Sequence, residues 1–120
     1  MIQKAAEVNG FTVEEWKDAP HWHDVRESIA KAVFGRILVG VNIYAADIRR
    51  LAAMFHPHDL GWIMPHSSID LQHLAKIAGL PRTNLEALCE HYGIEKETVH
   101  RAEGGVRRVR AVAEAMLRRP

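Results

Sequence analysis

A chain of 120 residues with 48% hydrophobic and 26% charged residues is typical of one soluble, globular domain. The formal net charge of +1 gives no general argument for a nucleic-acid partner, and no apolar run approaches the ~18 residues that cross a membrane. The single cysteine, Cys89, excludes an intrachain disulfide, and the first residues lack the apolar core of a secretory signal. We therefore expect a cytoplasmic protein in a reducing compartment.

The first forty residues predict two helices and a buried strand. Thr12–Glu15 (TVEE) has the capping-box pattern, so a short helix should begin there and be broken at Pro20. A second helix is expected from about His23 to Phe34, ended by Gly35. Residues 36–41 (RILVGV) form a continuous apolar run with β-branched side chains, which is typical of a buried parallel strand.

The middle of the chain predicts a helix, a short strand and another helix. The first helix should run from residue 44 to 55, because apolar side chains recur there at helical spacing: Tyr44, Ile48, Leu51 and Phe55. A second short strand is expected within residues 62–70 (WIMPHSSID). A helix should begin at Leu71, with Asp70 as its cap, and stop at Gly79 and Pro81.

Two helices should complete the chain. A second capping box, Thr83–Glu86, opens a helix over residues 85–93 in which Cys89 is expected to be buried. The last helix, over residues 106–118, should place its apolar side chains on one arc: Val106, Val109, Val112, Ala113, Met116 and Leu117. Strands mixed with helices indicate an α/β layer architecture, with residues 1–120 as a single domain.

Six segments follow one another in an order that resembles one enzyme family. They are Asn9–Thr12, Ala19–Pro20, Leu38–Asn42, and residues 69–76 (IDLQHLAK), 84–95 (NLEALCEHYGIE) and 100–105 (HRAEGG). They resemble His-Gly-Ile-Thr, Ala-Pro, Val-Gly-His-Asn, Ile-Asp-Thr-Leu-x-Leu-Ala-Arg, Leu-x-x-Leu-Cys-x-x-x-Gly-Ile and His-Arg-Ala-x-x-Asp of DnaQ-like (DEDDh) 3′–5′ exonucleases. The resemblance implies an α/β, truncated RNase H-like (exonuclease) fold that is mostly helical, with a short remnant parallel sheet.

The resemblance also implies a site for two Mg²⁺ or Mn²⁺ ions on four carboxylates. Two of these belong to an Asp-x-Glu strand, and the chain begins after its expected place. The second motif places Asp six residues after Gly40, where the chain has Ala46. Asp47 lies one residue late unless a one-residue insertion precedes it, which Leu51, four residues after Asp47, supports. The third motif places Asp at Gly105. At most one ligand remains, so we predict no metal, no other cofactor and no intrinsic nuclease activity.

Two residues correspond to catalytic groups of the family: Asp47 to a metal-binding carboxylate and His100 to the general base. Both also have structural explanations. An acid such as Asp47 is favoured near a helix start, and Arg50 is spaced to form an ion pair with it. His100 is equally explained as a surface histidine. Two further histidine pairs lack a second ligand pair at a recognisable spacing: His21-x-His23 and His56-x-His58.

Two surfaces are candidates for partners. Without the strands that precede it in the family fold, the strand 36–41 would have an unpaired edge and an apolar face, which predicts a homodimer or docking on another protein. Arginines form a second candidate surface, for single-stranded nucleic acid: Arg101, Arg107, Arg108 and Arg110, with Arg82. The favoured function is a catalytically inactive, protein-binding or regulatory module. The alternatives are a nucleic-acid-binding remnant and an exonuclease completed by another chain.

Overall fold

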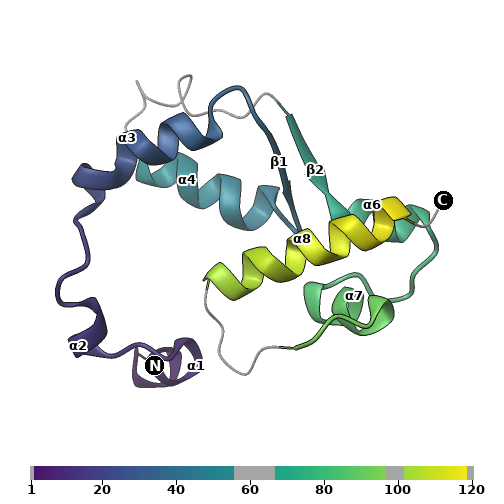
Figure 1. Ribbon diagram of the computed structural model, residues 1–120, viewed down its shortest axis with the longest axis horizontal. Coiled ribbons are helices and arrows are strands. Elements are labelled where there is room, and N and C mark those ends of the chain that lie inside the picture. The colour runs from purple at the N-terminus through teal and green to yellow at the C-terminus, as the bar shows by residue number, and fades with distance from the viewer. Residues whose placement is uncertain (1, 56–66, 97–101, 119–120) are drawn as a thin grey trace.

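The computed structural model describes residues 2–55, 67–96 and 102–118, and these form helices around a two-stranded sheet (Figure 1). The elements in chain order are α1 (Ile2–Asn9), α2 (Val13–Trp16), α3 (Trp22–Val33), β1 (Ile37–Gly40), the π-helix η1 (Tyr44–Ile48), α4 (Arg49–Met54), β2 (Ser67–Asp70), α6 (Leu71–Ile77), α7 (Leu85–Tyr92) and α8 (Ala102–Arg118). Every predicted element is present, and the predicted mostly helical α/β fold with a short parallel sheet is confirmed. The sequence patterns did not predict α1.

Polar side chains cap the N-termini of four described helices, α2, α3, α6 and α7, by accepting hydrogen bonds from free backbone N–H groups. Thr12 Oγ1 accepts from the N–H of Glu15 at 3.3 Å, as the capping box predicts. Asp70, the predicted cap of α6, accepts from the N–H of Gln72 at 2.9 Å. The predicted cap of α7 at Thr83 is wrong by one residue, because Asn84 is the residue that accepts there.

The two strands pair in parallel, with Ile37 opposite Ser67 and Gly40 opposite Asp70. Within the described residues, neither strand has a partner on its other edge. Side chains alternate between the two faces of a strand, so Ile37, Val39 and Ile69 share one face of the sheet. Between 40% and 56% of each of these three side chains is exposed, so this apolar sheet face is uncovered.

Two separate cores stabilise the fold. The larger lies between α6, α7 and α8 around five buried residues: Leu71, Ala75, Leu88, Cys89 and Val112. The smaller joins α3 to α4, where Ala30 and Phe55 are buried and the Trp22 ring meets the edge of Phe55 at a centroid distance of 4.8 Å.

The last helix, α8, begins at Ala102 rather than at residue 106. Its predicted arc is correct at the centre, but Val106 and Leu117 at its ends are exposed.

The apolar stripe predicted for residues 44–55 is wrong at its first position. Tyr44 is 61% exposed, and Ile43 is the buried residue instead. The cause is η1, in which the N–H of Ile48 donates to the carbonyl of Ile43 at 2.9 Å, five residues back. A turn of this type contains one more residue than an α-helical turn, so side chains before it are rotated relative to those after it. Leu51 and Phe55, which follow η1, pack as predicted.

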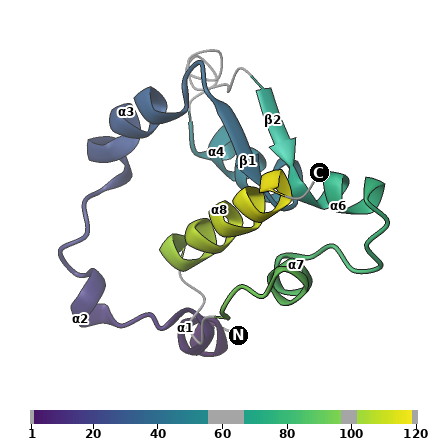
Figure 2. The same ribbon diagram turned by 45° about the vertical axis from the view of Figure 1, so that its right-hand side comes forward.

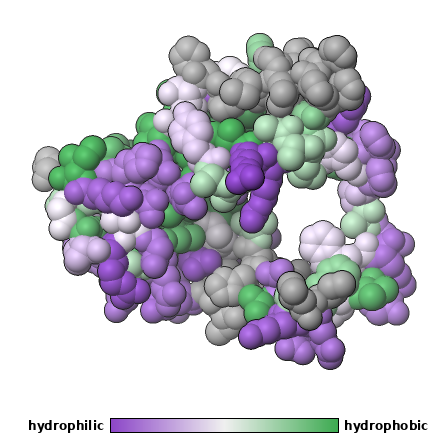
Figure 3. Space-filling model, turned by 180° about the vertical axis from the view of Figure 1, so that it is seen from behind, coloured by the Kyte–Doolittle hydropathy of each residue, from purple (hydrophilic) through white to green (hydrophobic). Residues whose placement is uncertain are grey.

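Residues 2–21, here called the N-terminal arm, lie away from the sheet and pack little on the rest of the chain (Figures 1 and 2). Residues 11–20 are all exposed, although the rings of Phe11 and Trp16 stack on each other at 6.3 Å. Figure 3 shows an opening between the arm and the other elements. The apolar side chains of the arm therefore cover little of the rest of the chain.

The whole chain is more open than its length requires. Its radius of gyration is 16.1 Å, compared with about 13.6 Å for a compact domain of this length. Its accessible surface is 9186 Å², compared with roughly 6,600 Å² for a typical monomer of 13.6 kDa. The difference of roughly 2,600 Å² is surface that an ordinary domain of this mass would bury. No helix among the described residues is long and apolar enough to cross a membrane.

Candidate functional site at the carboxyl end of the sheet

The ends of β1 and β2 meet at a single carboxylate, that of Asp70. The side chain is 8% exposed, and one oxygen, Oδ1, accepts two backbone hydrogen bonds. One comes from Gln72, at the start of α6, and the other comes at 3.0 Å from Asn42, in the turn that follows β1. Asp70 therefore fixes the turn after β1 to the first turn of α6 across 28 residues of sequence. The role of this oxygen is structural.

The turn after β1 has a conformation that few residue types accept. Asn42 has φ of +56°, in the left-handed region that asparagine tolerates better than most residues other than glycine. The backbone at Gly40 approaches Ile43 so closely that a Cβ on Gly40 would lie 3.0 Å from the Cβ of Ile43. The close Ile43 side chain favours glycine at position 40 and the positive φ favours asparagine at position 42, and the family-like Gly-x-Asn pattern keeps both.

The π-helix η1 explains the spacing of Asp47. In the family pattern, Asp follows the glycine by six residues and Leu follows that Asp by four. Here Asp47 and Leu51 both lie one residue later, and η1 occupies the interval between Gly40 and Leu51. A π-helical turn accommodates one inserted residue without moving the helix beyond it. This geometry favours the alternative in which Asp47, rather than Ala46, is the positional counterpart of the second-motif carboxylate.

Asp47 is nevertheless an isolated acid. It is exposed, and the predicted ion pair is not formed: among the described residues, no contact joins Asp47 to Arg50. Of the same residues, no three His, Cys, Asp or Glu side chains come close enough together to hold a metal ion. The described residues therefore do not fit the two-metal site of the family, and no catalytic step through a metal follows from their geometry.

The third-motif position lies in the first turn of α8. It is Gly105, and a Cβ built there would meet no other atom within 4 Å. The position has room for a Cβ, but the sequence provides no side chain there. His100 and Arg101, the adjacent candidate residues, lie outside the described residues.

The histidine pair at the start of α3 is explained by capping. The His21 and His23 rings stack at 4.9 Å, and His21 Nδ1 accepts a hydrogen bond from the N–H of His23 at 3.3 Å. This nitrogen is therefore occupied as the helix cap. His56 and His58 lie outside the described residues.

The candidate nucleic-acid arginines of α8 are mostly neutralised by acids of the same helix. Arg107 pairs with Glu103, and Arg110 pairs with Glu114 at 3.0 Å. The Nε of Arg108 donates to the carbonyl of Gly104 at 3.4 Å. Arg82 is exposed, in the segment between α6 and α7. Arginines held in pairs along one helix offer less charge to a phosphate backbone than the sequence count suggests.

Cys89 contributes to packing rather than to chemistry. Cys89 is completely buried in the larger core, as predicted, and burial raises the pKa of its thiol even though Arg108 and Lys96 oppose the shift. The raised pKa keeps the Cys89 thiol neutral and unreactive at neutral pH.

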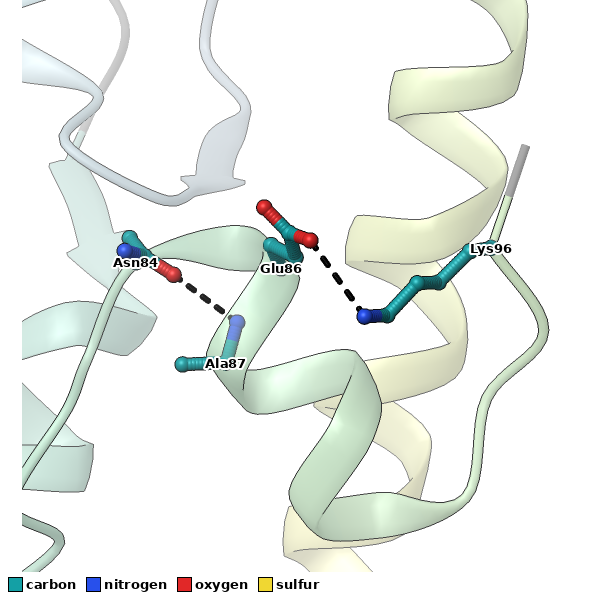
Figure 4. Close-up of polar contacts among 4 residues, drawn as sticks. All are labelled: Asn84, Glu86, Ala87 and Lys96. Carbon is teal, nitrogen blue, oxygen red and sulfur yellow. Dashed lines mark hydrogen bonds and ion pairs between the residues drawn. The ribbon is translucent and has the colours of Figure 1, made fainter. Parts of the chain in front are cut away.

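Glu86, in the first turn of α7, pairs with Lys96 at 3.3 Å, next to the cap formed by Asn84 and Ala87 (Figure 4).

Sequence patterns missed two features of this region. One is the hydrogen bond from Asn42 to Asp70, for which the only signal is an asparagine directly after an apolar strand. The other is η1, for which the residue types give no signal. The one-residue shift of Asp47 and Leu51 is the related sequence feature.

Comparison with known proteins agrees with the order of these elements. No curated protein matches the chain. The family model described as exonuclease (RNase_T) matches residues 1–107, which covers every element from α1 to the beginning of α8. The predicted resemblance is thereby confirmed, and the chain belongs to the RNase_T exonuclease family.

Proposed function

We propose that this chain is a catalytically inactive exonuclease-family domain that acts as a protein-binding or regulatory module. Two positions support the lack of activity. Gly105 has no side chain where the third motif needs a carboxylate, and Asp47 is exposed without another carboxylate beside it in the described residues. One carboxylate supplies too few oxygens for two hard cations.

The binding role is carried by the uncovered sheet. Its exposed apolar face, formed by Ile37, Val39 and Ile69, lies beside strand edges that have no partner in the described residues. Apolar surface next to an open strand edge favours association, either by strand addition or by face-to-face packing. The unusually large surface of the chain agrees with a domain whose core is completed by another polypeptide.

A second candidate function is an exonuclease that another chain completes. The observation that supports it is η1, because one extra residue in a π-helical turn agrees with Asp47 as a second-motif carboxylate. A strand added beside β1 by another chain would bring new side chains close to the turn at Asn42. The nucleic-acid-binding alternative has less support, because Arg107 and Arg110 are already paired.

Digestion of a 3′-labelled single strand, with Mg²⁺ and with Mn²⁺, tests the first half of the proposal. We expect no shortening of the strand by the wild type, and the same result for Asp47→Asn. Manganese-dependent shortening that Asp47→Asn abolishes would contradict inactivity and support the second candidate. Because a trace nuclease would be insensitive to the substitution, Asp47→Asn also controls for contamination.

Light scattering at tens of micromolar tests the second half. We expect the wild type to associate and the sheet-face variant, Ile37→Thr/Val39→Thr, to associate much less. Threonine keeps the β-branched shape of these positions but removes apolar surface, so the strand should persist. Ile77→Ser is the matched control, because Ile77 is an 84% exposed apolar residue on α6, outside the two strands. Equal association of all three proteins would contradict a role for the sheet face.

A further inference from the structure

The N-terminal arm carries apolar side chains that its own chain leaves uncovered. Val8, Phe11, Val13 and Trp16 are each 48% or more exposed. Both ribbon views place α1 and α2 on the opposite side of the molecule from β2, so the arm does not reach the exposed sheet face of its own chain (Figures 1 and 2). The protein thus has two uncovered apolar surfaces that do not meet within one copy.

The two parts of the chain also differ in charge. The arm, residues 2–21, contains four acidic residues and two lysines, for a net charge of −2. The chain as a whole has a net charge of +1, so the rest of it carries +3. Opposite charges favour contact between the arm and the remainder of another copy, and they disfavour contact between two arms.

We infer that two copies of this chain form a two-fold dimer by exchanging their N-terminal arms. The apolar side chains of each arm, centred on the stacked Phe11 and Trp16 rings, pack on the sheet face of the other copy. This inference rests on the proposed protein-binding role and names the partner as a second copy. Exchange of an identical element between copies closes a symmetric assembly and leaves no unmatched surface.

The available area is sufficient for such a dimer. A standard stable interface buries about 800 Å² on each partner. The surface that this chain exposes beyond a compact monomer is roughly 2,600 Å², several times that amount. Aromatic side chains are the residues that contribute most to interfaces of this size, and each arm supplies two that already stack on each other.

The test combines three variants of the full chain, each first checked for folding by circular dichroism. The arm variant is Phe11→Ser/Trp16→Ser, the sheet-face variant is Ile37→Thr/Val39→Thr, and Ile77→Ser is the control. Sedimentation should show dimers for the wild type and for Ile77→Ser. For the arm variant, we expect a dissociation constant at least about tenfold higher, since buried aromatic side chains are frequent interface hot spots.

Mixing then separates arm exchange from its alternatives. The arm variant keeps an intact sheet face and the sheet-face variant keeps an intact arm, so an equimolar mixture retains one complete contact. We expect mixed dimers in it, at a concentration where each variant alone is monomeric. A mixture that stays monomeric, or an arm variant that dimerises as well as the wild type, would overturn arm exchange. If the arm variant still dimerises while the sheet-face variant does not, the proposed binding role stands without the arm.

Discussion

Replacing Asp70 by alanine should reduce the free energy of unfolding more than loss of an ordinary helix cap. The substitution removes the oxygen that accepts from Gln72 at 2.9 Å and from Asn42 at 3.0 Å. Loss of the cap costs about 1 kcal/mol. The Asn42 N–H would also lose its acceptor in a site where the replaced side chain is largely buried, which adds about 1–3 kcal/mol. We therefore expect Asp70→Ala to cost about 2–4 kcal/mol in total.

Two controls isolate the link between the strands. Asn84→Ala removes a cap that accepts a single hydrogen bond, from Ala87, and should cost only about 1 kcal/mol. Asp70→Asn keeps an oxygen that can accept both bonds and should cost less than Asp70→Ala. Urea unfolding followed by far-ultraviolet circular dichroism measures all three at neutral pH. If Asp70→Ala costs no more than Asn84→Ala, the bond to Asn42 does not stabilise the fold and the reasoning fails.

Three further substitutions test other contacts by the same urea assay. Gly40→Ala places a Cβ 3.0 Å from the side chain of Ile43 and should cost about 1–3 kcal/mol, with a smaller loss in an Ile43→Ala background. Gly105→Ala adds a Cβ that meets nothing within 4 Å, so it should raise the free energy of unfolding by about 0.5–1 kcal/mol. A lower free energy of unfolding would show that α8 needs the glycine. Because burial raises the pKa of Cys89, the unfolded thiol ionises first: stability should be complete below its ordinary pKa of 9.0 and fall as the pH rises above it. That part of the pH dependence should be absent in Cys89→Ala; a thiol reagent that labels the native protein as fast as the unfolded one would contradict burial.

Local signals predicted most of the fold. The capping box at Thr12, the apolar run of β1 and the glycine before it each depend on a few adjacent residues, and the structure agrees with them. The burial of Leu88 and Cys89 also follows from helical spacing within one helix. These features could be predicted because neighbouring residues alone determine them.

The features that sequence patterns missed depend on contacts or register. A uniform helical period predicted Tyr44 in the core stripe, but η1 interrupts that period and Tyr44 is exposed. The last helix was predicted from the apolar arc that starts at Val106, but α8 already begins at Ala102, before that arc. For the site, the motif spacing singled out Asp47 and Gly105, but it could not predict η1, which depends on the hydrogen bond from Ile48 to Ile43.

The π-helix has a consequence for how this protein tolerates deletion. Removing one residue from an ordinary α-helix turns everything beyond it by about 100°, which would pull its apolar side chains out of the core. Here the π-helical turn contains one residue more than an α-helical turn. Deletion of Ala45 would convert the five-residue spacing between Ile43 and Ile48 into the regular four-residue one. Leu51 and Phe55 could then stay against Ala30, so the shortened chain should keep the same core with an uninterrupted α-helix.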